Sequence, residues 1–179
     1  GVIRPEWKIA VPWHIVAGAI NPNSDYAYLG RRLPANGTDI ICVANLNALT
    51  IDTVNDCYDL TYAGASWYIT SMIVNADGDR LYVFDAYGYA YVFAISGGGA
   101  TLSLLNSRQT LSSAAGTAYA INQVYLDESG ATPYVYLVTD DNSGEFRKMG
   151  IDEPSGWFSS TSTYAYVSST PVVDFTDIE

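Results

Sequence analysis

The fold is decided by the stretch Ile69–Val83, which reads ITSMIVNADGDRLYV. It contains an apolar, β-branched run, a polar turn from Asn75 to Asp79, and a second apolar run around Tyr82. Asn, Asp and Gly tolerate the positive φ angles of tight turns, and β-branched and aromatic residues suit pleated strands. The stretch therefore predicts an antiparallel hairpin.

The same pattern occurs twice more, in IVAGAINPNSDYAYL (Ile15–Leu29) and in INQVYLDESGATPYVYL (Ile121–Leu137). The three stretches begin 54 and 52 residues apart. A second strand–turn–strand pattern follows each of them, as where Tyr89–Ile95 is followed by a glycine-rich turn and another apolar run. Four short strands that recur every 50 residues or so predict a repeat of four-stranded antiparallel units, with almost no helix.

The residues Asn75–Asp85, followed by Tyr89–Ile95, resemble blades of the YVTN-type and NHL-like β-propellers. In those blades a turn with Asp-Gly precedes a strand like Leu-Tyr-Val. Ser24 stands where the second repeat has Gly78, and the third turn is longer. The resemblance implies an all-β, β-propeller-like fold of three four-stranded antiparallel blades. It implies no single activity, because the family includes binding scaffolds, surface-layer proteins and some enzymes.

We predict one repeat region over residues 1–179, with repeats at about 15–66, 67–118 and 119–170 and flanking strands at 7–11 and 171–175. Propellers close with about four to eight blades, so three blades form a partial or oligomer-completed propeller. We expect the remaining blades to come from other copies of the chain or from the rest of a longer propeller. The predicted assembly residues are apolar residues of the flanking strands: Trp7, Ile9, Val11, Val172, Val173 and Phe175.

The net charge of −11 excludes nucleic acid as an expected partner, because phosphate binding needs an excess of Lys and Arg. No stretch of about 20 apolar residues occurs, so we expect no membrane insertion. Many Ser, Thr, Asn, Asp and 15 Tyr residues favour an extracellular location or a cell or particle surface.

Few residues suit catalysis or metal binding. His14 is the single histidine, so histidine-based triads and multi-histidine metal sites are not expected, although a carboxylate pair stays open. Asn75–Asp79 resembles part of a calcium loop, but the twelfth position is Ala86 instead of Glu, and a hairpin turn is favoured. The residues 140–145 are interpreted as a solvated acidic loop. We therefore predict no catalytic residue, metal or cofactor.

Two modifications have alternatives that stay open. Cys42 and Cys57 lie on strands assigned to one hairpin, so they form a disulfide in an oxidising compartment or remain buried thiols in a reducing one. Asn36 begins the sequon Asn-Gly-Thr, which is either a glycosylation site or a chance triplet.

The candidate binding residues are acidic and aromatic residues in loops that share one propeller face. They come from the turns between second and third strands and from the junctions between blades: Tyr62, Trp67, Asp85, Tyr87, Tyr89, Tyr119, Asp140 and Asp141. Such a face suits a carbohydrate or a cationic peptide, because rings stack on sugars and attract cations. The alternative for Trp67 and Tyr119 is that they wedge adjacent blades together.

These observations favour a non-enzymatic extracellular structural or binding module that uses a propeller scaffold and self-assembles. The alternative is a hydrolase or lyase that uses carboxylates on the propeller face. An enzyme should bring carboxylates together in a pocket, whereas a scaffold should spread its chemistry over the loops.

Overall fold

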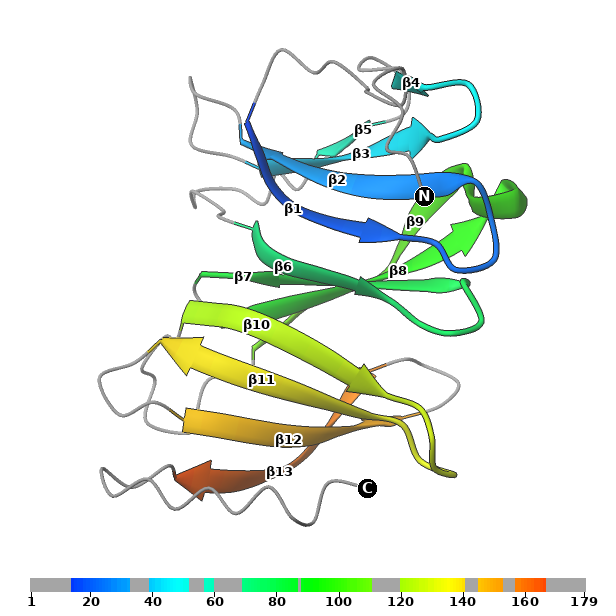
Figure 1. The fold of residues 1–179 in the computed structure, drawn as a ribbon. Helices are drawn as coiled ribbons and strands as arrows, with labels where there is room; N and C mark the ends of the chain where they lie inside the picture. Colours follow the sequence, from blue (N-terminus) through cyan, green and yellow to red (C-terminus); the bar gives the residue numbers. More distant parts are fainter. Residues whose placement is uncertain are drawn as a thin grey trace, which may run out of the picture.

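The computed structural model describes residues 14–32, 39–51, 57–59, 69–86, 88–110, 120–140, 145–152 and 157–166. These residues form three antiparallel sheets that follow one another along the chain and stack face to face (Figure 1). The predicted fold class is confirmed. None of the described residues belongs to a helix long and apolar enough to cross a membrane.

The first sheet contains β1 (Ile15–Ile20), β2 (Tyr26–Arg32), β3 (Asp39–Asn45), β4 (Thr50–Ile51) and β5 (Cys57–Asp59). Both β4 and β5 pair with β3. Cys42 lies directly opposite Cys57, and a disulfide joins them. The covalent bond therefore links β5, which has only three residues, to the sheet.

The second sheet has the strand order β6 (Ile69–Val74), β7 (Arg80–Asp85), β8 (Tyr89–Ser96) and β9 (Thr101–Thr110), with a 3-10 turn at Gly97–Gly99 before β9. Its two faces are both covered, because it lies between the other two sheets (Figure 1). This explains why nearly every residue of β7 and of the middle of β8 is buried.

The third sheet has the order β10 (Ala120–Asp127), β11 (Tyr134–Asp140), β12 (Glu145–Asp152) and β13 (Trp157–Tyr166). The first strands of the three sheets, β1, β6 and β10, lie side by side (Figure 1). Each of them carries a β-bulge near its start, between Ile15 and Ala17, between Ile69 and Ser71, and between Ile121 and Gln123, opposite the end of the next strand. The repeat is therefore preserved even in this irregularity, which bends all three first strands alike.

Alternation along β7 divides its side chains between two apolar cores. Val83 joins the core between the first and second sheets, together with Tyr28 and Phe93. Tyr82 and Phe84 join the core between the second and third sheets, together with Leu137. Successive side chains point to opposite faces of a strand, so one strand supplies both cores.

Candidate functional site

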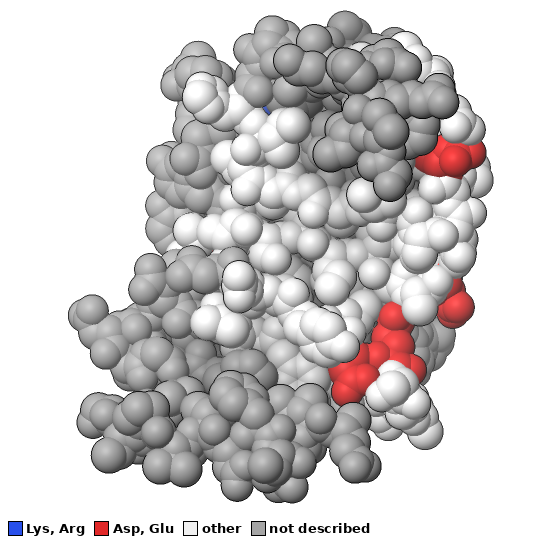
Figure 2. Space-filling view, viewed as in Figure 1, with Lys and Arg blue, Asp and Glu red and all other residues white. Residues whose placement is uncertain are grey.

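The turns β1–β2, β6–β7 and β10–β11 lie at one edge of the stack, and we call this edge the turn rim. Acidic side chains gather there, along the right edge of Figure 2. They come from all three turns: Asp25, Asp77, Asp79, Asp127 and Glu128. The predicted turns at Asn21–Asp25, Asn75–Asp79 and residues 127–132 thus share one face, as the repeat required.

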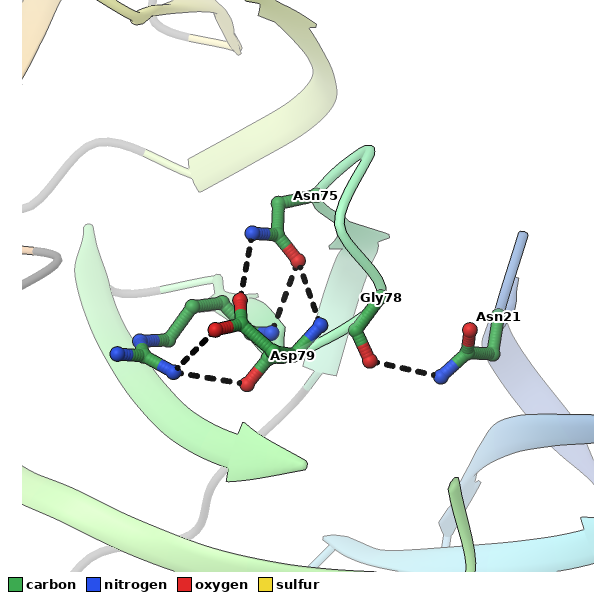
Figure 3. A network of polar contacts seen from close by, with 5 residues as sticks. Asn21, Asn75, Gly78 and Asp79 are labelled. Atoms are coloured by element: carbon green, nitrogen blue, oxygen red, sulfur yellow. Dashed lines mark hydrogen bonds and ion pairs between the residues drawn. The ribbon is translucent and has the colours of Figure 1, made fainter. Parts of the chain in front are cut away.

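The β6–β7 turn owes its shape to Asn75 (Figure 3). Asn75 Oδ1 accepts hydrogen bonds from the backbone N–H groups of Asp79 (3.0 Å) and Arg80 (2.9 Å). Asn75 Nδ2 donates to Asp79 Oδ1 at 2.8 Å, and Gly78 occupies the left-handed region at φ 70°. The residues that resembled a calcium loop therefore use their oxygens to close a hairpin turn. Within the described residues, no group of three or more His, Cys, Asp or Glu is placed to hold a metal ion.

Hydrogen bonds connect the three turns to one another. Asn21 Nδ2 donates to Gly78 O at 2.9 Å, and Asn23 Nδ2 donates to Ala76 O at 2.8 Å (Figure 3 shows the first). On the other side, Ala76 N donates to Glu128 Oε2 at 2.6 Å. The side chains of one repeat thus fix the turn of the next, and the rim is held as a unit.

A cleft of about 360 Å³ lies between the second and third turns. Its lining is polar and comes from both repeats: Asn75, Asp77, Asp79, Arg80, Glu128, Gly130 and Pro133. We call it the turn cleft. Its volume is within the range of small-molecule sites, and it combines three carboxylates with one guanidinium.

The charged groups of the turn cleft are held to different degrees. Arg80 Nη1 contacts Asp79 O at 3.0 Å and Asp79 Oδ2 at 3.1 Å, while Arg80 Nε is a buried donor without a hydrogen-bond partner. Glu128 is engaged by Ala76 N. Asp77 is exposed and makes no hydrogen bond or ion pair within the described part of the chain. The cleft thus has one free carboxylate beside a guanidinium that is held in place.

The pKa of a neighbouring carboxylate, that of Asp127, is lowered by hydrogen bonds within its own turn. Asp127 Oδ1 accepts hydrogen bonds from Ser129 Oγ (2.7 Å) and Ser129 N (3.0 Å). These bonds hold the pKa of the Asp127 carboxyl below its usual value, because they stabilise the charged form, and the Lys148 charge adds to this effect. Asp127 therefore stays ionised at the end of the rim.

The predicted binding residues fall elsewhere. Asp85 is only 1 % exposed at the end of β7, and its Oδ1 accepts a hydrogen bond from Tyr89 N at 3.0 Å. Burial raises the pKa of the nearby Tyr91 phenol, and the Asp85 charge raises it further. Asp85 and the half-buried Tyr89 thus form a turn below the surface. Asp140, another predicted binding residue, is the last residue of β11. The other candidates lie outside the described residues: Tyr62, Trp67, Tyr87, Tyr119 and Asp141.

The remaining predicted sites also lie outside the described residues. They are the sequon at Asn36 and the assembly residues Trp7, Ile9, Val11, Val172, Val173 and Phe175. The sequence did not single out Asp77, Arg80 and Glu128 as a site. The available signal was the repeat itself, because equivalent turns that share one face bring their polar residues together.

The stacked sheets are similar to solved β-propellers. The β-propeller domain of Cps50 (Swd1) from Myceliophteria thermophila matches 84% of this chain at a TM-score of 0.56 and 16% identity. The periplasmic gluconolactonase PpgL from Pseudomonas aeruginosa matches 79% of this chain at a TM-score of 0.56 and 18% identity. A Bacteroides fragilis protein described as a candidate 6-phosphogluconolactonase matches 86% of this chain at a TM-score of 0.60 and 15% identity. The chain therefore has the β-propeller fold, and the resemblance noted in the sequence is confirmed at the level of fold.

The chain covers only 43%, 37% and 42% of these three solved chains, respectively, so it spans less than half of their length. No protein-family model matches it, and none of the curated proteins is detectably related to it in sequence.

These similarities overturn one prediction. The non-enzymatic extracellular structural or binding module is not supported by them, whereas two of the matched propellers carry the names of lactonases. The prediction of a non-enzymatic module relied on the scarcity of histidine, which argues only against histidine-based mechanisms. Carboxylates and one arginine lie together in the turn cleft.

Proposed function

We propose that the chain is part of a propeller hydrolase that opens a neutral, polyhydroxylated lactone in the turn cleft. The observation that carries the proposal is the free carboxylate of Asp77 in the same cleft as the held guanidinium of Arg80. The names of two similar propellers, a gluconolactonase and a candidate 6-phosphogluconolactonase, support the substrate class.

The proposed chemistry uses water and two side chains. The Asp77 carboxylate takes a proton from water as the water oxygen attacks the lactone carbonyl carbon. The contacts of the Arg80 guanidinium with Asp79 both use Nη1, so Nη2 donates to the oxyanion that forms on the carbonyl oxygen. The ring C–O bond then breaks, the alkoxide accepts the proton that Asp77 holds, and the product is a hydroxy acid.

The charge of the cleft selects the substrate. Three carboxylates face one guanidinium, so the cleft carries excess negative charge. A phosphorylated or carboxylated substrate would be repelled, whereas the hydroxyl groups of a neutral lactone can donate to Glu128 and Asp79. We therefore expect a preference for gluconolactone over its 6-phosphate.

The test is hydrolysis of glucono-δ-lactone by the purified chain. The reaction is monitored as acid release at constant pH, and the rate of spontaneous hydrolysis is subtracted. Asp77→Asn should lower kcat by about 10²–10⁴, the usual contribution of a general base. Asp25→Asn is the matched control, because Asp25 lies on the same rim outside the cleft. A rate equal to the spontaneous one, or an unchanged kcat in Asp77→Asn, would overturn the proposal.

The location stays a prediction. A disulfide between Cys42 and Cys57 is compatible with an oxidising compartment, where such bonds persist.

A further inference from the structure

The backbone on the N-terminal side of Asp77 is held from both neighbouring repeats. Ala76 N donates a hydrogen bond to Glu128 Oε2 at 2.6 Å, and Ala76 O accepts one from Asn23 Nδ2 at 2.8 Å. Glu128 lies in the β10–β11 turn and Asn23 in the β1–β2 turn. The residue that precedes the proposed base is therefore fixed by the third repeat through its N–H group and by the first repeat through its carbonyl group.

The backbone on the C-terminal side of Asp77 is held in the same way. Gly78 N donates to Asn75 O at 3.0 Å, and Gly78 O accepts from Asn21 Nδ2 at 2.9 Å (Figure 3). Glycine allows many orientations of the peptide plane, so the contact with Asn21 fixes the direction of this carbonyl group. Both carbonyl groups that flank Asp77 thus accept a hydrogen bond from an asparagine of the first repeat.

The amide group of Asn21 is itself fixed. Asn21 is 3% exposed, and its Nδ2 also donates to Tyr28 Oη at 3.2 Å, while Tyr28 Oη donates to Gly99 O at 2.9 Å. Asn21 Oδ1 accepts a hydrogen bond from Asn23 N at 2.9 Å. One buried amide therefore holds the carbonyl group of Gly78 and also orients Asn23, which holds that of Ala76.

These contacts matter for the proposed base because its carboxylate has no contact of its own. A general base has to lie within about 2.6–3.2 Å of the proton that it takes, and a displacement of about 1 Å can lower a rate about 10²-fold. Within the described residues the Asp77 carboxylate makes no hydrogen bond or ion pair, so its place depends on the backbone that carries it. Asn21 and Asn23 do not line the turn cleft, so they can act only through that backbone.

We propose that Asn21 and Asn23 are positioning residues for the reaction in the turn cleft. From the first repeat they hold the carbonyl groups on either side of Asp77, and they thereby keep its carboxylate in place. This inference rests on the proposed function, because it takes Asp77 as the base. The site then depends on three repeats, although its lining comes from only two.

Replacement of Asn23 tests the proposal, because this side chain is exposed and its loss opens no core. Asn23→Ala should lower kcat for glucono-δ-lactone about tenfold to hundredfold. KM should change little, since Arg80 keeps its contacts with Asp79. Asn23→Ser also lacks the amide and should give the same result. In Asp77→Asn, the addition of Asn23→Ala should lower kcat no further, because both changes act on the same base.

Asn47→Ala is the matched control. Asn47 is exposed, and its N–H group donates to Asn45 Oδ1, as that of Asn23 donates to Asn21 Oδ1. Its Nδ2 donates to Asp25 Oδ2 at 2.6 Å, so this contact stays within the first repeat. Asn47→Ala should therefore keep the kcat of the wild type. An equal loss of kcat in both variants would overturn the proposal, as would a further loss when Asn23→Ala is added to Asp77→Asn.

A measurement without substrate separates this inference from the proposed function. The NMR order parameter of the Asp77 amide should be that of a rigid backbone, about 0.85, in the wild type and in Asn47→Ala, and it should fall toward about 0.6 in Asn23→Ala. An unchanged order parameter in Asn23→Ala would overturn the inference, whatever the chain hydrolyses. A wild type that gives only the spontaneous rate would overturn the proposed function and with it the catalytic role of Asn23. The order parameter would still show whether Asn23 holds Asp77.

Discussion

Phe93 shows how one side chain holds two repeats together. It is 0% exposed in the core between the first and second sheets, and the ring of Tyr58 meets it edge-on with centres 4.9 Å apart. Tyr58 belongs to the first repeat and Phe93 to the second, so the contact joins neighbouring blades. Edge-to-face pairs add to the free energy gained by burial.

Replacing Phe93 with Ala should therefore lower the free energy of unfolding by about 3–5 kcal/mol, through lost burial and the cavity that remains. Urea unfolding measures the loss. Leu104→Ala is the matched control, because Leu104 lies opposite Phe93 in the adjacent strand and is 36% exposed. A loss below about 1 kcal/mol for Phe93→Ala would place this side chain outside the core.

Two buried tyrosines make the stability depend on alkaline pH. Burial raises the pKa of Tyr28 and of Tyr91 above the ordinary value of 10.0. In the unfolded chain both phenols ionise near that value, whereas in the folded chain they ionise only at higher pH. The folded state then binds more protons than the unfolded state, so the stability that both groups contribute is complete below pH 10 and falls as the pH rises beyond it.

For each group the loss approaches about 1.4 kcal/mol per pH unit between its unfolded and its folded pKa. Urea unfolding at a series of alkaline pH values measures it. Tyr91→Phe should make the profile less steep, because phenylalanine does not ionise. An equal slope in the variant and the wild type would show that Tyr91 does not contribute to the loss of stability at alkaline pH.

At the scale of elements, the β6–β7 turn depends on Gly78 for two reasons. Its φ of 70° is unfavourable for other residues, and a Cβ atom there would lie 2.5 Å from Asn21 Oδ1. The second reason concerns the neighbouring repeat, because Asn21 donates a hydrogen bond to Gly78 O. A side chain at this position would separate two turns of the rim.

Gly98 offers a control with the same backbone and no neighbour. Its φ is 68°, and no atom lies within 4 Å of an added Cβ. Gly98→Ala should cost about 1–2 kcal/mol from the backbone alone. Gly78→Ala should cost about 1–2 kcal/mol more, because the Asn21 hydrogen bond is also lost. Equal losses in thermal unfolding would mean that the contact between turns adds nothing.

The disulfide joins the short strand β5 to the first sheet. β5 has three residues, and Cys42–Cys57 closes a loop with a sequence separation of 15. A loop of that length gives about 3 kcal/mol, since the cross-link restricts the unfolded chain. The double change Cys42→Ala and Cys57→Ala should lower the free energy of urea unfolding by that amount. Reduced wild type should match the variant; a variant as stable as oxidised wild type would contradict the prediction.

At the scale of the whole molecule, charge opposes compactness. The net charge is −11, and carboxylates from three repeats gather at the turn rim (Figure 2). Salt screens such repulsion between exposed charges, with a Debye length of about 8 Å at physiological ionic strength. The fold therefore places like charges together and relies on its two apolar cores to hold them.

Sodium chloride at moderate concentration should consequently raise the free energy of unfolding by about 1 kcal/mol relative to low salt. Chloride is preferable to sulfate in this measurement, because sulfate stabilises proteins by exclusion from the surface. Asp77→Asn should reduce the gain, since it removes one rim charge. A stability that decreases with chloride would show that attractive ion pairs outweigh the repulsion.

The sequence by itself determined the strands, the turns and the number of repeats. These features are local, because turn residues and the alternation of apolar side chains act within a few positions of one another. The assignment of Tyr82 and Val83 to opposite faces needed only that alternation. The sequence also placed the three turns on one edge, since equivalent parts of stacked repeats must coincide.

The tertiary structure alone decided the candidate site. Ala76 and Glu128 are 52 residues apart, and only the stacking of the second and third sheets brings them to 2.6 Å and forms the turn cleft. The same stacking buries Asp85, which the sequence had placed on a binding face. It also leaves Tyr125 exposed while Ile73, its equivalent in the second sheet, packs against a core. The physical reason is that burial depends on which surfaces meet, and a repeat pattern is identical for a covered blade and an uncovered one.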